Sequence, residues 1–407
     1  MLLDLSHTSH TRALTGIQRV ARGLWQEIGA RAEPICHDPY ARAWRPLEAW
    51  ELANLASAPS GQSRGAHWPL RARLRGLLRR TLSKVERVAP NTLVRSLSQT
   101  GVLGAIRPTF GEGLLIPEIF SPDVAAALPA LFAAVSGPRT ALFFDAVALK
   151  YPEMTPAKIV ARYPAYLCEL LAFDGIAAIS ADARDTLLEY WRWLEVKEHP
   201  PVVAIPLGVD NKISKFEIRN SKFRVVLSVG SLEGRKNHLA LLDACETLWA
   251  AGMNFKLQLI GAARPETGRA ALARIAALQA AGRPLRYDGV VDDPALEAAY
   301  AACAFTVYPS LMEGFGLPVS ESLVRGKPCI CSGRGALGES ARGGGCVALD
   351  EVDAPSLAAA ISRLLTDKSA LERLSAEARA RKFKSAADYA RELSDWMVSL
   401  PSHPKKT

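Results

Sequence analysis

Two glutamates with seven residues between them form the most informative pattern in this 407-residue chain. Glu313 and Glu321 lie in the run PSLMEGFGLPVSE, where an apolar strand is expected to end near Tyr308 and a helix to begin near Pro318. One carboxylate then precedes the helix and the other lies about one turn inside it. Both can accept charge-assisted hydrogen bonds from the hydroxyl groups of one ligand. The alternative is an ordinary capped helix with solvated acids.

Glycines in the same run favour an anion beside these acids. Gly314 and Gly316 leave backbone N–H groups uncovered at the start of the predicted helix. Because the helix dipole is positive at this end, the loop suits an anion such as a diphosphate.

A second motif, GSLEGRKN, covers residues 230–237 and directly follows the predicted strand FRVVLSV. At the carboxyl edge of the same sheet, Lys236 would face the anion held by the glycine loop. A cation there stabilises the charge that grows on a departing diphosphate. The motif is neither a GxxxxGK[ST] loop nor a GxGxxG loop, and an Arg-Lys pair taken alone is more often a solvated pair.

The elements around these motifs alternate between short apolar strands and amphipathic helices throughout the second half of the chain. This alternation predicts an α/β fold with a parallel sheet covered on both faces, in which ligands bind beyond the carboxyl ends of the strands. The first half alternates less regularly, and a division falls near residues 208–222. We expect an N-terminal domain (1–210) with an insert (about 40–105), a linker (211–223), a C-terminal domain (224–385) and a final helix with its tail (386–407).

The composition is that of a globular protein, with 49% hydrophobic and 22% charged residues. No apolar run approaches the roughly 20 residues of a membrane span, and the N-terminus does not resemble a secretory signal, so we expect a cytoplasmic protein. Seven cysteines without a CxxC pair suit a reducing compartment, and Cys329 and Cys331 are expected to be buried thiols on a strand. The histidines form no HxH or HExxH pattern, so no metal site is expected.

The net charge of +9 is concentrated in one segment. Between residues 61 and 95, nine Lys and Arg side chains accompany a single acid, Glu86, which leaves +8 there. Leucines and valines recur at helical spacing through residues 64–95, which is typical of a basic amphipathic helix. Such a helix suits an anionic membrane surface, or packs on its own domain through the leucines. Nucleic acid is not favoured, because Trp68 is the one aromatic residue among these arginines.

Together the two motifs resemble the retaining GT-B glycosyltransferases, family four in particular, whose signature is E-x7-E in an EGFGLP context. The resemblance also includes YDGVVDDPALEAAYAAC and PLGVD. It covers residues 224–365 strongly, the N-terminal half loosely and residues 40–105 hardly at all. It implies two Rossmann-like domains with a nucleotide-sugar donor in the cleft between them.

The resemblance also implies roles for residues of the C-terminal domain. Glu313 would bind hydroxyl groups of the transferred sugar and Glu321 those of the ribose. Lys236, with Arg235, would clamp the diphosphate. The residues that would line the sugar and the diphosphate are Ser231, Gly314, Phe315, Gly316 and Leu317.

In the N-terminal half, Gly16 of TGIQRV matches the glycine loop that faces the donor phosphates, and Asp145 of FFDAV matches the aspartate of an HD pair on the acceptor side. The sequence departs from the family pattern at two positions. Phe144 stands where many relatives carry histidine, so no base is assigned there. Ser231 stands where many carry arginine, which places more weight on Arg235 and Lys236.

The function implied by the resemblance is hexose transfer with retention, without a metal or other cofactor. We expect mannose from GDP-mannose, with UDP-glucose, UDP-GlcNAc and dTDP-rhamnose as alternatives. The expected acceptor is a saccharide or lipid-linked saccharide of bacterial lipopolysaccharide, O-antigen or exopolysaccharide synthesis, with the protein peripheral on the inner membrane. The rival interpretations are a non-catalytic scaffold subunit with the same fold and a nucleotide-sugar epimerase.

Overall fold

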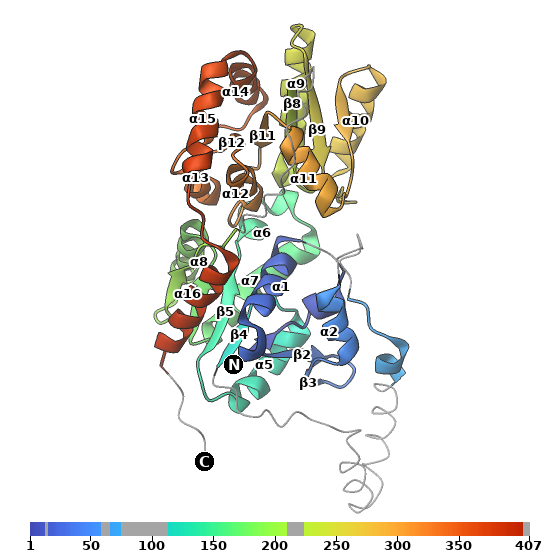
Figure 1. The fold of residues 1–407 in the computed structure, drawn as a ribbon. Helices are drawn as coiled ribbons and strands as arrows, with labels where there is room; N and C mark the ends of the chain where they lie inside the picture. Colours follow the sequence, from blue (N-terminus) through green and yellow to red (C-terminus); the bar gives the residue numbers. More distant parts are fainter. Residues whose placement is uncertain (13–14, 58–65, 75–112, 210–223, 402–407) are drawn as a thin grey trace, which may run out of the picture.

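A computed structural model describes residues 1–12, 15–57, 66–74, 113–209 and 224–401. These residues form two sheets, one from each half of the chain (Figure 1). The first sheet has the order β3-β2-β1-β4-β5-β6-β7, and all of its pairs are parallel except β2 with β3. Its strands are β1 (Leu2–Asp4), β2 (Glu33–Asp38), β3 (Ala43–Pro46), β4 (Leu114–Ile116), β5 (Arg139–Phe143), β6 (Gly175–Ala178) and β7 (Val202–Ala204).

The second sheet is parallel throughout, in the order β10-β9-β8-β11-β12-β13. Its strands are β8 (Arg224–Val229), β9 (Phe255–Ile260), β10 (Leu285–Tyr287), β11 (Phe305–Tyr308), β12 (Cys329–Ser332) and β13 (Cys346–Leu349). The predicted α/β class with parallel sheets is confirmed. Cys329 and Cys331 are buried free thiols on β12, as predicted.

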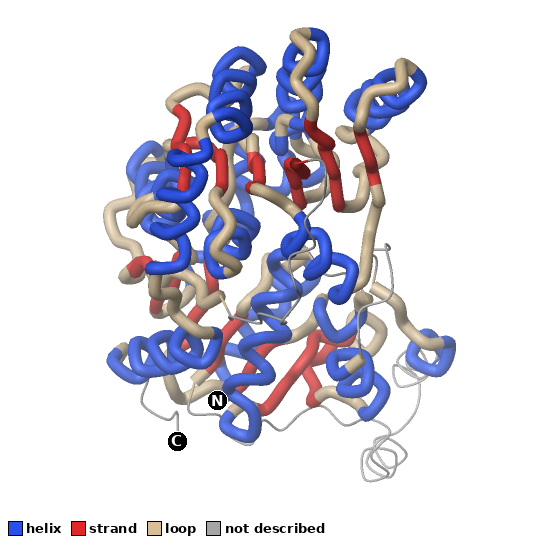
Figure 2. The backbone as a smooth tube through the Cα atoms, turned by 45° about the horizontal axis from the view of Figure 1, so that its top comes forward, coloured by secondary structure: helices blue, strands red, loops and turns tan. Residues whose placement is uncertain are grey.

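Helices cover both sheets (Figure 2). The first half contains α1 (Gly16–Ile28), α2 (Ala49–Ala56), α5 (Pro122–Ala134), α6 (Val147–Lys150), α7 (Ala157–Glu169) and α8 (Ala181–Trp193). The second half contains α9 (His238–Ala250), α10 (Arg269–Ala280), α11 (Asp293–Ala302), α12 (Leu317–Val324), α13 (Gly335–Ala341), α14 (Ala354–Thr366), α15 (Lys368–Ala380) and α16 (Ala386–Ser399). Several begin at a capping side chain: the hydroxyl of Ser180, for example, accepts a hydrogen bond from the amide of Ala183 at the start of α8.

The apolar strands are buried on both faces, which explains why they read as continuous hydrophobic runs. Along β1, for example, Leu2 and Leu3 belong to different core clusters on opposite faces of the first sheet. Burial of each such side chain stabilises the fold by about 1.5–3 kcal/mol. The cores thereby hold the carboxyl ends of the strands, where the predicted motifs lie, in fixed positions.

Helix α16 returns to the N-terminal domain after the chain has completed the second sheet (Figure 1). Its Tyr389, Leu393 and Met397 join the core cluster that contains Leu24 of α1. The segment before it lies against the end of the first domain, where the amide of Val209 donates to the carbonyl of Lys384 over 2.8 Å. The final helix, expected as a separate element over 386–407, is therefore part of the N-terminal domain's packing.

Parts of the sequence predictions lie outside the described residues. The linker 211–223 does, as does most of the basic segment 64–95, of which residues 66–74 are described. Within the expected insert, β3 forms the edge strand of the first sheet and α2 follows it along the chain. In the described part of the chain, no helix combines the length and apolar character needed to cross a membrane.

Candidate active site

The loop with the two glutamates connects β11 to α12, and the helix begins at Leu317, next to the predicted Pro318. Gly316 precedes the helix in the left-handed conformation, with φ of 93°, which a residue with a side chain rarely adopts. A Cβ at position 316 would also lie 2.8 Å from a methyl group of Leu337. The glycine therefore sets the direction in which the chain enters α12.

Glu313 lies in this loop, buried between two cations. Its Oε1 is 2.6 Å from Nζ of Lys236 and 2.7 Å from Nη1 of Arg235. Burial alone would raise the pKa of Glu313, but the positive charges of Arg235 and Lys236 outweigh it and lower the pKa to about 2. The structure thus brings together three residues that the sequence analysis assigned to one site from positions 77 and 78 residues apart.

Lys236 is itself buried, in the 3-10 turn Gly234–Lys236. Its ammonium group donates to the hydroxyl of Tyr308 and lies 4.7 Å from the centre of that ring. Burial lowers the pKa of Lys236 below its usual value, and Glu313 partly offsets this effect. Sequence reasoning did not assign a role to Tyr308, although its place as the last residue of the strand before the glutamate loop was a usable signal.

Arg235 connects the two motif loops. Its guanidinium donates to the carbonyl of Met312 over 3.1 Å and pairs with Glu233 over 2.9 Å. The hydroxyl of the predicted Ser231 donates to the same Glu233 carboxylate over 3.1 Å. Glu233, another residue that was not assigned, therefore orients both Ser231 and Arg235.

Glu321 lies one turn inside α12 and belongs to a different set of contacts. Its carboxylate pairs with Arg19 from α1 of the other domain. The hydroxyl of Tyr300 donates to its second oxygen over 3.4 Å. Arg19 was missed by the sequence analysis, although it stands one helical turn after Gly16 in TGIQRV.

Gly16 and Asp145 are the predicted site residues of the N-terminal domain. Gly16 opens α1, and a Cβ there would meet no described atom within 4 Å. Asp145 is half-buried; burial raises its pKa, whereas the charge of Arg235 lowers it. Its Oδ1 accepts a hydrogen bond from the amide of Val147 over 3.0 Å. Asp145 is thus electrically coupled to the cations that hold Glu313.

The glutamate loop also rests on the N-terminal domain. The hydroxyl of Ser180 donates to the carbonyl of Gly314 over 2.7 Å, and a Cβ at position 314 would lie 2.1 Å from the carbonyl oxygen of Phe144. The side chains of the predicted Phe315 and Leu317 pack against the core cluster of that domain. In this structure both side chains contribute to the interface between the domains, and their backbone belongs to the end of the loop and the start of α12.

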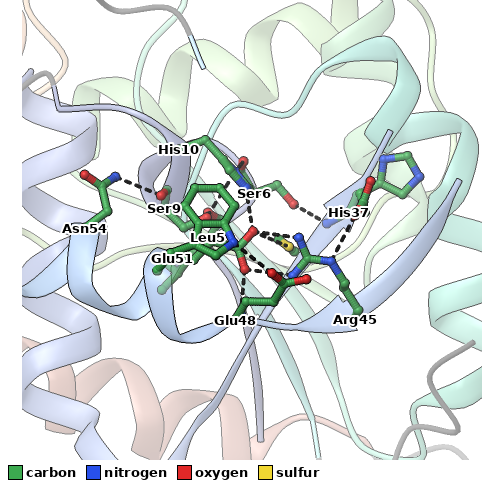
Figure 3. Close-up of polar contacts among 12 residues, drawn as sticks. Leu5, Ser6, Ser9, His10, His37, Arg45, Glu48, Glu51 and Asn54 are labelled. Atoms are coloured by element: carbon green, nitrogen blue, oxygen red, sulfur yellow. Dashed lines mark hydrogen bonds and ion pairs between the residues drawn. The ribbon is translucent and has the colours of Figure 1, made fainter. Parts of the chain in front are cut away.

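A separate cluster of potential metal ligands lies in the N-terminal domain (Figure 3). Ligand atoms of His10, Cys36 and Glu51 lie within 4.8 Å of one another. However, both oxygens of Glu51 bind the guanidinium of Arg45, each over 2.7 Å, and one also lies 2.7 Å from Nε2 of His10. Burial raises the pKa of the Cys36 thiol, which disfavours the thiolate that a metal requires. The cluster is therefore a buried ion-pair network that fixes β3 and α2 to the sheet.

Part of the chain matches a known protein family. Residues 209–381 match the family described as glycosyl transferases group 1. The O-antigen chain mannosyltransferase B of Escherichia coli is 36% identical over 144 residues, which cover 35% of this chain and 37% of that protein. The serotype-specific mannosyltransferase WbdA of Escherichia coli is 28% identical over 355 residues, which cover 81% of this chain and 38% of that protein. This chain thus spans well under half the length of these relatives.

Solved structures show the same two-domain fold. Anabaena HepE in complex with UDP and glucose superposes with a TM-score of 0.65 at 15% identity, covering 98% of this chain and 99% of that one. Sucrose-phosphate synthase from Thermosynechococcus elongatus gives a TM-score of 0.64 at 18% identity, covering 97% of both chains. The architecture is that of the GT-B glycosyltransferases, as the sequence predicted.

Proposed function

Because residues 209–381 match the family of glycosyl transferases group 1 and the chain has the GT-B fold, we propose that it is a retaining glycosyltransferase. It moves a hexose from a nucleoside diphosphate sugar onto a saccharide or lipid-linked saccharide. The observation that carries this proposal is the buried contact of Glu313 with Lys236 and Arg235 beside the start of α12. A site with a positive helix end, two cations and a carboxylate suits a ligand that has both a diphosphate and hydroxyl groups.

In the proposed reaction, the diphosphate lies against the start of α12, and Lys236 and Arg235 neutralise it. Glu313 accepts hydrogen bonds from the transferred sugar and Glu321 from the ribose. The bond between the anomeric carbon and the diphosphate breaks while the acceptor oxygen attacks the same face. The acceptor proton passes to the departing diphosphate, so no protein base and no metal ion is required. The cations act mainly on the transition state, in which the leaving charge is largest.

We propose mannose from GDP-mannose as the donor. The support is that O-antigen chain mannosyltransferase B, WbdA and the MMP alpha-(1->4)-mannosyltransferase of Mycolicibacterium hassiacum, 32% identical over 182 residues, are all mannosyltransferases. UDP-glucose, UDP-GlcNAc and dTDP-rhamnose are the alternatives. Since two of these relatives act in O-antigen synthesis or define a serotype, we propose an acceptor in bacterial surface polysaccharide synthesis.

A thermal-shift screen of the full chain against GDP, UDP, dTDP and ADP tests the donor. A ligand at a hundred times its Kd stabilises the folded state by about 2.7 kcal/mol, so the preferred nucleotide should raise the Tm clearly above the others. The matching nucleotide sugar and a panel of saccharides should then yield a glycoside that keeps the donor's anomeric configuration. Sugar rearrangement without an acceptor would indicate an epimerase, and nucleotide binding without turnover would indicate a scaffold subunit.

An anionic membrane surface is the proposed partner of residues 64–95. Within the described part of this segment, Leu70 and Leu74 are exposed beside Arg71 and Arg73. Deletion of residues 64–95 should release the protein from vesicles that contain phosphatidylglycerol, as measured by flotation. Unchanged flotation would contradict a membrane role.

A further inference from the structure

The two carboxylates of the glutamate loop are neutralised from opposite sides of the cleft. Glu313 is held by cations of its own domain, whereas Glu321 is held by Arg19 of α1 in the N-terminal domain (Figure 1 places α1 and α12). Among the described residues, the Glu321 carboxylate has one further side-chain hydrogen bond, the long one from Tyr300. Arg19 therefore supplies the charge that compensates this buried acid.

The ion pair joins the first turns of two helices. Arg19 lies one turn after the start of α1, a helix of 13 residues, and Glu321 one turn after the start of α12, a helix of 8 residues. Because both side chains come from the first turns, the positive ends of both helices lie near the ion pair. A cation between two positive helix ends would be stabilised poorly without Glu321, and the same place would be favourable for an anion.

The two partners are buried to different extents. The side chain of Glu321 is 7% exposed, but that of Arg19 is 47% exposed. Attraction to Glu321 raises the pKa of Arg19, so the guanidinium remains charged. Arg19 is thus a permanent cation with a solvent-accessible side chain, and it is held by a buried carboxylate.

We propose that Arg19 is a nucleotide-positioning residue that exchanges partners when the donor binds. In the protein without a donor, the guanidinium of Arg19 is paired with the carboxylate of Glu321. When the donor enters, the guanidinium transfers to the diphosphate, and Glu321 becomes available to the two ribose hydroxyls. This inference rests on the proposed function, and it deepens that function by explaining selection for a diphosphate.

Only a ligand that carries phosphate offers Arg19 a new anionic partner in place of Glu321. A guanidinium forms bidentate, charge-assisted bonds with phosphate as it does with carboxylate, so Arg19 loses no partner when a nucleoside diphosphate binds. A nucleoside has hydroxyls for Glu321 but nothing for Arg19, so it must break the ion pair without replacing it. The pair therefore discriminates against nucleosides by more than the loss of the phosphate contacts to Lys236 and Arg235.

Calorimetric titration of Arg19→Gln in the full chain tests this exchange. The ligands are the nucleoside diphosphate that stabilises the wild type most and the corresponding nucleoside. We expect the affinity for the diphosphate to fall at least tenfold, and the affinity for the nucleoside to stay unchanged or rise because Glu321 is now free. Arg19→Lys should recover part of the diphosphate affinity. Arg373→Gln, which removes one partner of an exposed pair on α15, should alter neither affinity.

Three outcomes would overturn the inference. In the first, Arg19→Gln binds the diphosphate as well as the wild type does. In the second, it loses diphosphate and nucleoside affinity by the same factor, which would assign Arg19 to domain packing alone. The third uses Glu321→Gln, in which Arg19 is released from its carboxylate; an unchanged preference for diphosphate over nucleoside in this variant would contradict the exchange even if Arg19→Gln fails to fold. A wild type that binds no nucleoside diphosphate would instead refute the proposed function itself.

Discussion

The carboxyl edges of the two sheets both contain buried acids, but they neutralise them in different ways. In the C-terminal domain, Glu313 contacts two cations, and its pKa falls to about 2. In the N-terminal domain, Asp4 ends β1 and lies near Glu118, which follows β4. Burial, and then repulsion from Glu118, raise the pKa of Asp4 to about 7. A buried carboxyl group is therefore fully charged at one edge, whereas at the other it titrates near neutral pH.

The contacts explain this difference. The amide of Ser6 donates to Asp4 over 2.9 Å, and the amides of His7 and Thr8 donate to Glu118 over 2.9 and 2.8 Å. These partners belong to the loop after β1 and cannot leave without unfolding it. The side-chain cations around Glu313, in contrast, can turn to another anion. We infer that the C-terminal edge is built to exchange ligands, whereas the N-terminal edge is built to hold the shape of the cleft.

The largest expected effect comes from replacement of Lys236, the buried cation at the carboxyl edge of the second sheet. Lys236→Ala should lower kcat at least about a hundredfold, because one fixed charge aimed at a developing anion contributes about 2.7–4 kcal/mol. The Tm should change much less, since Arg235 still neutralises Glu313. Steady-state kinetics at saturating donor measure the loss, with Lys382→Ala, an exposed lysine, as the control. A near-normal kcat would contradict the proposal that the cations at the carboxyl edge of the second sheet act on the donor.

The next largest effect is expected from a change in the contact between the glutamate loop and the N-terminal domain. In Gly314→Ala, the new methyl group would lie 2.1 Å from the carbonyl oxygen of Phe144, so the glutamate loop must move away from the N-terminal domain. We expect kcat/KM to fall about 10- to 100-fold, because displacement of catalytic groups by about 1 Å has effects of this size. In Gly23→Ala, within α1, the methyl group has no described neighbour within 4 Å. This control should keep full activity and gain up to about 1 kcal/mol of stability.

Replacement of Glu313 and Glu321, one at a time, separates the roles of these two carboxylates at the carboxyl edge of the second sheet. Glu313→Gln should reduce the transfer rate about tenfold with little change in nucleotide affinity, because Glu313 faces the transferred sugar in the proposed reaction. Glu321→Ala should first raise the donor KM, since its proposed partner is the ribose. Kinetics and calorimetry on both variants test this division, and identical profiles would show that the two acids act as one group.

The smallest effect concerns the pH dependence of stability at the N-terminal edge. The folded pKa of Asp4 is about 7 and its ordinary value is 3.8, so folded protein holds the proton more tightly than unfolded protein does. The stability contributed by the neutral form is complete below about pH 4 and is lost as the pH rises to about 7. Asp4→Asn should therefore gain stability relative to the wild type over this interval, by a few degrees of Tm. A difference that does not change with pH would show that Asp4 is already charged.

Local motifs made the C-terminal half predictable. The strand, the glycine turn and the helix start around Glu313 follow from residues adjacent in the sequence, and parallel strand order then brings Lys236 to the same edge. The contacts across the cleft could not be predicted in this way. Arg19 meets Glu321 across 302 positions, and Ser180 meets Gly314 across 134. Such pairs depend on how the two domains sit together, which neither periodicity nor turn chemistry encodes. The return of α16 to the N-terminal domain was missed for the same reason.

That return has a mechanical consequence. The last described residues of the N-terminal half and the residues that follow the C-terminal domain lie side by side: a Cβ at Gly208 would come within 2.1 Å of the carbonyl oxygen of Ser385. A few loop residues at such a place can act as a hinge between two domains. We therefore expect the domains to move relative to each other about the contact of Gly208 with Ser385, so that closure brings α1 and α12 together.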